Sequence, residues 1–260
     1  MSEADRFFQA TKKHPERYYV VHYSSQSLFD DGVEDGGLSP RITSIVVMHF
    51  ATRQTLAFAI HNVAEELGIP KEEIHKRFSE VEREILERFY TFARDRREKY
   101  WVHWNMRNLV FGFEHLEHRY RVLTGKDSPH IPVEVRVNLN DILRLRYGSD
   151  FVPDPKMLNL MLKNGERDKR FLTGQEEADA FKSHDFIRMN SSTICKVEFF
   201  RYVIVLAQSG RLKTSSKGLL VAVDRLLDGR PARLAAFATT AVSLVAGIVT
   251  GLLWLVETIL

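Results

Sequence analysis

The sequence predicts an α/β protein, a mixed sheet flanked by helices, followed by a single C-terminal transmembrane helix. Three observations predict this architecture. Three β-rich apolar runs come early in the chain, and an amphipathic stretch with apolar residues three and four positions apart follows them. The third observation is a long uncharged apolar run near the C-terminus. We therefore divide the chain into an α/β domain at 1–209, a basic segment at 210–233 and a transmembrane helix at 234–256.

The three early runs are "RYYVVHYSS", "RITSIVVMHF" and "TLAFAIH", and the first two alternate poorly between apolar and polar residues. We therefore expect helices to cover both faces of the sheet. The amphipathic helix, from Pro70 to about Glu98, leads into a further strand, "YWVHW". Such a strand–helix–strand crossover predicts parallel pairing. The second half of the chain is expected to be helical around 111–124, 139–147, 156–163, 174–182 and 186–208.

The C-terminal run, "LAAFATTAVSLVAGIVTGLLWLV", carries no charge over 234–256. At about 1.5 Å per residue it is just long enough to cross about 30 Å of hydrocarbon. The N-terminal "MSEADRFFQATKKHPER" has no apolar core like that of a signal peptide, so a tail anchor is predicted. The segment at 210–233, directly before the span, contains six basic residues. This positive charge predicts that the N-terminal domain is cytoplasmic and that the C-terminus lies outside.

The predicted span has a stripe of small residues four positions apart, including Ser243, Gly247 and Gly251. Such a stripe lets two helix backbones approach closely, as in the GxxxG pattern. We therefore expect a homo-oligomer that associates through the membrane helix, although small residues are also common in membrane helices generally.

Composition adds little about function. The net charge of +3 is too small to indicate nucleic-acid binding by itself. The one cysteine, Cys195, lies in an apolar run and is expected to be a buried structural thiol.

Three stretches resemble the RNase H-like 3′–5′ exonucleases, especially the proofreading-type domains of family B polymerases and their bacterial relatives. "YYVVHYSS" with "SPRITSIVV" is similar to the first two strands of that family. "EREILERFYTFARDRREKYWVHWNMRNLVFGFEHLEHRYRVLTG" is similar to the helix, strand and helix of its second motif, and "AFKSHDFIRMNSSTICKV" to the third. The resemblance covers about 16 to 208 and implies an RNase H-like mixed sheet.

In this family four carboxylates hold two divalent ions that cleave phosphodiesters. The resemblance places His22 and Ser24 at the first motif's Asp and Glu, Val110 at the second motif's Asp, and Lys196 at the third motif's Asp. Valine has no ligand atom for a metal, and lysine repels one. We therefore expect no metal cofactor and no catalytic residues. Two residues that help the family's scaffold, Asn105 and Arg119, are retained.

The former active-site cleft is then expected to bind a ligand, either a nucleotide or single-stranded nucleic acid. The residues that would line it are His22, Ser24, Asn105, Arg107, Val110 and Lys196. The aromatic residues Tyr100, Trp101 and Trp104 are of the type that stacks bases in single-strand binders. The alternative for these aromatics is a place in the core of the sheet.

The function expected from these features is a membrane-tethered, catalytically inactive, exonuclease-like binding or sensing module at the cytoplasmic face. This architecture resembles small bacterial membrane effectors of stress or phage defence. One alternative is a divergent Mg²⁺- or Mn²⁺-dependent nuclease that uses displaced carboxylates such as Asp31 and Asp185. Another is a protein-interaction scaffold without nucleic-acid contact, which would show a filled cleft and an exposed apolar patch.

Overall fold

The computed structural model describes residues 1–26, 39–107 and 111–215, and these contain a mixed sheet of five strands. The strands are β1 (Tyr18–Ser25), β2 (Ile42–His49), β3 (Thr55–Ala59), β4 (Tyr100–His103) and β5 (Arg136–Asn138), and their order across the sheet is β3-β2-β1-β4-β5. β1 pairs antiparallel with β2 and parallel with β4. The predicted mixed sheet and the parallel pairing after the crossover are therefore confirmed.

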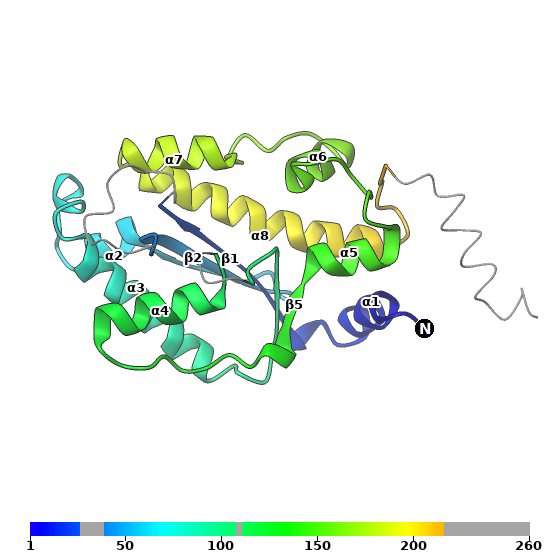
Figure 1. Ribbon diagram of the computed structural model, residues 1–260, viewed down its shortest axis with the longest axis horizontal. Coiled ribbons are helices and arrows are strands. Elements are labelled where there is room, and N and C mark those ends of the chain that lie inside the picture. The colour runs from blue at the N-terminus through cyan, green and yellow to red at the C-terminus, as the bar shows by residue number, and fades with distance from the viewer. Residues whose placement is uncertain (27–38, 108–110, 216–260) are drawn as a thin grey trace, which may run out of the picture. The chain divides into compact units, whose positions relative to one another are not determined.

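Helices cover both faces of the sheet, as the sequence predicts (Figure 1). Alternate residues of β1 point to opposite faces, so Val20 joins one apolar core and Val21 joins the other. The first core also contains residues of α1 (Glu3–Lys13), α5 (Leu139–Tyr147), α6 (Lys156–Lys163) and the long α8 (Phe186–Gln208). The second contains residues of α2 (Ile60–Glu66), α3 (Phe78–Arg94) and α4 (Phe113–Thr124), with α7 (Gly174–Lys182) at its edge.

The later helices occupy the residues that their apolar spacing predicts. α5, α6, α7 and α8 have the expected bounds, and α8 is followed by Gly210 in the left-handed region, with φ 69°. The helix expected from Pro70 begins only at Phe78, after a short 3₁₀ turn at Lys71–Glu73. Ile74 is nevertheless buried, so the helix-like spacing of apolar residues begins at Ile74, four residues before the helix itself.

Besides short 3₁₀ turns, three elements were not expected from the sequence. α2 begins at Ile60, so the end of the third β-rich run is helical and not extended. α1 begins after Ser2, whose hydroxyl accepts a hydrogen bond from the Asp5 N–H, and its Phe7 and Phe8 enter the core. β5 has three residues, too few for a recognisable period. The predicted membrane span at 234–256 lies outside the described residues, and among the described helices none is long and apolar enough to cross a membrane.

Candidate functional site

The carboxyl ends of β1, β4 and β5, which run in parallel, meet at one edge of the sheet. Ligands of open α/β sheets bind outside such ends, so we take this edge as the candidate site. The structure divides the sequence-predicted residues into two groups here. His22, Ser24 and Lys196 are buried between β1 and α8, whereas Asn105 and Arg107 follow β4 and lie nearer the surface.

An ion pair stands at the centre of the buried group. Lys196 Nζ of α8 lies 2.6 Å from Glu177 Oε1 of α7, and the lysine side chain is 7% exposed. The same carboxylate oxygen also accepts hydrogen bonds from Ser24 Oγ at 3.2 Å and Ser192 Oγ at 3.1 Å. One oxygen therefore has three donors, and its charge is matched by the lysine.

Hydroxyl groups extend this network across the face of the sheet. Thr193 Oγ1 of α8 lies 2.9 Å from Ser24 Oγ and 3.2 Å from Ser44 Oγ of β2. Thr43 donates to the carbonyl oxygen of Ser24 at 3.1 Å. Buried polar groups are costly unless they are hydrogen-bonded, and these hydroxyls satisfy one another. The network fills the space between the end of β1 and α8.

His22 faces α8 from the middle of β1 and is 5% exposed. Burial, and then the charges of Lys196 and His103, hold the pKa of His22 well below its usual value, so the ring is neutral. Its Nδ1 has no hydrogen-bond partner among the described residues, and the ring packs edge-on against Phe200 at 5.4 Å between centroids. The neighbouring His103 also has its pKa lowered, to about 3, chiefly by burial.

The surface group is organised by asparagines. Asn105, just beyond β4, has a φ of 53°, in the left-handed region that asparagine tolerates best after glycine. Its Oδ1 accepts hydrogen bonds from the side-chain amides of Asn138 at 3.2 Å and Asn140 at 3.1 Å. Its backbone N–H donates to Asn138 Oδ1 at 3.1 Å. The turn after β4 is thereby fixed to the end of β5.

Arg107 extends from this cluster. Its side chain is 51% exposed, and Nη1 donates to Asp141 Oδ2 at 2.5 Å. Asp141 also accepts from Asn138 Nδ2 at 2.8 Å, and Asn138 itself caps α5 by accepting from the Asn140 N–H. Asp141, itself held by Asn138, therefore positions the guanidinium of Arg107, which still faces solvent.

The aromatic residues near Arg107 do not form a stacking platform. Trp101 and Trp104 are buried, and Trp104 stacks on Phe200 of α8 with 5.7 Å between ring centroids. Tyr100 stacks on Tyr18 of β1 at 4.9 Å. Both tryptophans are thus core residues, because β4 lies inside the sheet and helices cover its two faces.

Arg119 and Glu82 link three elements, α4, α3 and β2. From α4 it reaches the fully buried Glu82 of α3, with Nε 2.8 Å from Oε1 and a second contact through Nη2. The same Glu82 oxygen accepts the backbone N–H of Ile42, the first residue of β2, at 2.8 Å. Burial raises the pKa of Glu82, while Arg119 and this N–H oppose the rise.

The displaced-carboxylate alternative gains no cluster from the described residues. Asp185 caps α8 by accepting from the Arg188 N–H at 3.2 Å. It lies about 16 Å along the helix from Lys196, at about 1.5 Å per residue. Asp31 and Val110 lie outside the described residues. Within the described ranges, no three His, Cys, Asp or Glu side chains are grouped to hold a metal ion.

The donor set at the described motif positions does not fit Mg²⁺ or Mn²⁺. These ions prefer several hard oxygen ligands, chiefly carboxylates. His22, Ser24 and Lys196 provide an imidazole, a hydroxyl and a cation, and the one carboxylate that reaches them among the described residues, Glu177, is already bound to the lysine. These residues therefore do not form a site suited to metal-dependent hydrolysis.

Sequence reasoning missed the partners of these residues. Glu177 looks like a surface residue in the first turn of a helix, and Ser192 and Thr193 look like helix interior. Only the run "VNLND" at 137–141, with its asparagines directly after a β-rich segment, is a signal that could have indicated a polar cluster at a strand end.

Comparison with known proteins adds no family to this description: no family model, no curated protein and no solved structure matches the chain.

Proposed function

We propose that this protein is a membrane-tethered, catalytically silent, exonuclease-like module that binds a nucleotide or single-stranded nucleic acid at the carboxyl edge of β1, β4 and β5. The mixed sheet with β2 antiparallel to β1 is consistent with an RNase H-like fold, and it supports the resemblance of the sequence motifs. The tether is the uncharged run at 234–256.

The observation that carries this proposal is the buried Lys196–Glu177 ion pair. In the exonuclease family the third motif places a carboxylate on the last helix, opposite the first strand. Here α8 places an ammonium group there, opposite His22 and Ser24, and a carboxylate from α7 neutralises it. A cation held in this way repels a divalent metal at short range. We therefore assign a stabilising role, and not a metal-binding role, to the Lys196–Glu177 pair.

Ligand contact is assigned to the exposed part of the edge. The guanidinium of Arg107 is partly exposed, and the asparagine cluster around Asn105 holds the backbone beside it. Arginine suits phosphate recognition because its planar donors match two phosphate oxygens. Without ligand, Arg107 donates a hydrogen bond to Asp141. When a phosphate binds, Arg107 would donate to the phosphate oxygens as well or instead.

The test measures binding and cleavage together on the full-length chain in detergent. Labelled 12-nucleotide DNA and RNA are titrated at two salt concentrations, with Mn²⁺ or with EDTA, and followed by fluorescence anisotropy and gel electrophoresis. We expect binding that weakens with salt, because phosphate contacts release counterions, that is unaffected by EDTA, and that leaves the oligonucleotide intact. Arg107→Gln is expected to weaken binding.

Arg121→Gln is the matched control, since Arg121 is an exposed arginine near the C-terminal end of α4 and, like Arg107, pairs with an aspartate, here Asp127. Cleavage that requires Mn²⁺ and is lost in Asp185→Asn would overturn the silent-module proposal in favour of the displaced-carboxylate nuclease. Binding equal in Arg107→Gln and wild type would overturn the assigned contact.

The scaffold alternative is favoured by one observation, the burial of His22, Ser24 and Lys196 between β1 and α8. Its second requirement is an exposed apolar patch. The exposed large apolar residues of the described chain lie on different elements or toward opposite ends of α8: Met1, Leu56 on β3, Leu67 after α2, Val122 on α4, Val133 before β5, Leu145 on α5, Leu162 on α6, and Ile187 and Tyr202 on α8. Absence of all oligonucleotide and nucleotide binding would leave the scaffold as the better account.

A further inference from the structure

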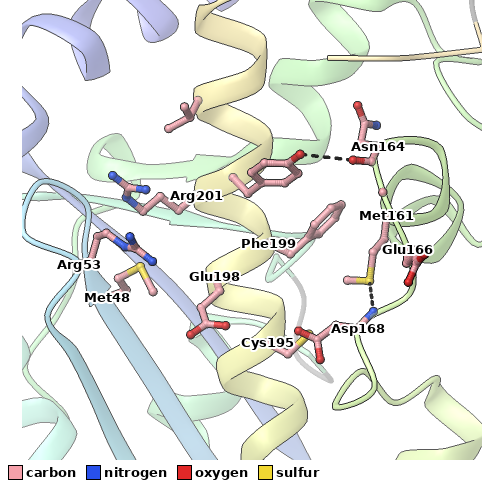
Figure 2. Close-up of a pocket in the computed structure, with 13 residues that line it drawn as sticks. Met48, Arg53, Met161, Asn164, Glu166, Asp168, Cys195, Glu198, Phe199 and Arg201 are labelled. Carbon is pink, nitrogen blue, oxygen red and sulfur yellow. Dashed lines mark hydrogen bonds between the residues drawn. The ribbon is translucent and has the colours of Figure 1, made fainter. Parts of the chain in front are cut away.

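A cavity lies on the side of α8 opposite the network around Lys196. It has a volume of about 530 Å³, within the usual range of small-molecule sites. One wall is α8, a second is α6 with the loop that follows it, and the third is the end of β2 with its turn into β3 (Figure 2). None of the function described above uses this cavity.

Two arginines line one end of the cavity without a described carboxylate partner. Arg53 comes from the β2–β3 turn and Arg201 from α8, and Figure 2 shows their guanidinium groups side by side. Arg201 donates its Nε to the carbonyl oxygen of Phe50 at 2.9 Å, which leaves both terminal nitrogens for another partner. Within the described ranges neither arginine forms an ion pair, whereas Arg167 and Arg170, on the segment after α6, both do. Two adjacent cations without an anion repel each other, and a bound anion would remove this cost.

The backbone holds Arg53 in place for such a role. Its φ of 64° lies in the left-handed region, an unusual conformation for arginine. The turn is fixed by the Arg53 N–H, which donates to the His49 carbonyl at 2.9 Å, and by a 2.9 Å contact between His49 Nδ1 and Thr52 Oγ1. Backbone conformations of this kind are unfavourable for residues other than glycine, and they occur preferentially at ligand sites.

Three acids, Glu166, Asp168 and Glu198, line the rest of the cavity, and two of them share one arginine. Arg170 binds Asp168 at 2.7 Å and Glu198 at 2.6 Å. The hydrogen bonds from Arg170 lower the pKa of Asp168 to about 2, so it stays ionised. The three carboxylates outnumber the single charge of Arg170, so this part of the cavity would repel a polyanion that extended into it. A ligand that fits the two poles therefore has one anionic group and not a chain of phosphates.

The space between the two poles is apolar. Phe199 and Tyr202 of α8 provide aromatic surface, and Met48 and Met161 provide thioether side chains, which pack well against aromatic rings. Cys195 also lines the cavity, and burial, followed by the charge of Asp168, raises the pKa of its thiol to about 12. The thiol is therefore a packing group and not a nucleophile.

We propose that this cavity binds a small organic monophosphate with an aromatic body, of the class of nucleoside monophosphates. The phosphate lies between the guanidinium groups of Arg53 and Arg201, and the aromatic body lies against Phe199 and Met161. Paired arginine forks suit the two charges and three oxygens of a terminal phosphate. This site is separate from the oligonucleotide edge of the proposed function, and it makes the domain a receptor for a free nucleotide as well.

Isothermal titration of the full-length chain in detergent tests this proposal, with AMP and UMP as probes and adenosine, uridine and inorganic phosphate as comparisons. At least one monophosphate is expected to bind to a site that Arg107→Gln leaves unchanged, which distinguishes the cavity from the edge of the proposed function. Its nucleoside and inorganic phosphate are each expected to bind at least tenfold more weakly, because each lacks one half of the recognised group. A charge-assisted hydrogen bond contributes enough for about a tenfold change or more in Kd.

Arg53→Gln is the decisive variant, since Arg53 is an exposed turn residue whose side chain the fold does not require, and it is expected to weaken monophosphate binding at least tenfold. Arg201→Gln is expected to do the same, with its circular dichroism spectrum as the check on folding. Arg121→Gln is the control. Equal affinity of Arg53→Gln and wild type, equal affinity for phosphate and monophosphate, or no binding of either monophosphate would overturn the proposal. Oligonucleotide binding that persists in that last case would leave the proposed function standing.

Discussion

Removing one partner of the Lys196–Glu177 ion pair is expected to cost far more stability than removing both. The Lys196 side chain is 7% exposed and the Glu177 side chain 18%, so the two groups have little contact with water and are paired with each other. Breaking a buried pair typically costs about 3–5 kcal/mol, whereas replacing the whole pair is often nearly neutral. This difference makes the pair a direct test of whether α8 is locked onto the end of β1 by charge.

The structure sets the expected order of the single changes. Glu177→Gln keeps an acceptor for the hydroxyls of Ser24 and Ser192 but leaves a nearly buried ammonium unpaired, so we expect a loss of about 4 kcal/mol. Lys196→Met leaves a carboxylate that water still reaches and that two hydroxyls still stabilise, so we expect about 3 kcal/mol. The double variant is expected to lie within about 2 kcal/mol of wild type.

The assay is urea unfolding of the four proteins, followed by far-ultraviolet circular dichroism, with the coupling energy taken from the double-mutant cycle. The exposed pair Arg77–Glu80, whose side chains are 43% and 40% exposed, is the matched control and is expected to show a coupling below about 1 kcal/mol. Additive losses at Lys196 and Glu177, or single losses below about 1 kcal/mol, would show that water screens this pair and would remove the main support for a closed site.

Three further results are expected. Arg119→Met should lower stability by about 3–5 kcal/mol at neutral pH, because Glu82 is then buried without its partner. The raised pKa of Glu82 means that this deficit should shrink as the pH falls through that pKa and the acid becomes neutral, which urea midpoints at several pH values measure. The lowered pKa of His103, about 3, means that the unfolded state binds more protons below about pH 6.5, so stability should fall with pH, and less steeply in His103→Gln. Asn164→Ala should speed hydrogen exchange at the Lys213 amide about tenfold, because Asn164 Oδ1 accepts that N–H at 2.7 Å.

Each of these results has a contradicting outcome. An Arg119→Met deficit that does not change with pH would show that Glu82 does not titrate in the folded state of the variant. Equal pH slopes for wild type and His103→Gln would assign the acid sensitivity to other groups, such as His22. Unchanged exchange at Lys213 would show that Asn164 does not hold the segment after α8.

Much of the fold could be predicted from the sequence because its signals are local. The apolar spacing of residues 186–208 and the Gly after it define α8 within the chain itself, and the capping pattern at Thr173 with Glu176 defines the start of α7. The β-rich runs of β1 and β2 are likewise visible without partners. By contrast, α1 combines charged residues with two phenylalanines, and its core position depends on a surface provided by α5 and α8.

The candidate site was only half visible. The motif order pointed to His22, Ser24 and Lys196, and these do converge between β1 and α8. The sequence could not show that they are closed over, because Glu177 contacts Ser24 across 153 positions and Lys196 across 19. The same holds for the cavity at Arg53 and Arg201, whose two arginines meet only when the β2–β3 turn packs beside α8.

By itself, therefore, the sequence determined the α/β class and the later helices, since each depends on residue type and short-range spacing. It also determined that His22, Ser24 and Lys196, which the resemblance aligns with metal ligands, are not carboxylates. The tertiary structure alone decided that a carboxylate from α7 pairs with the lysine of α8, that Trp101 of β4 and Trp104 after it are core residues, and that two arginines without a described ion pair share one cavity. The physical reason is that charge pairing, burial and cavity shape arise between side chains distant in the chain, and local patterns carry no information about which distant groups will meet.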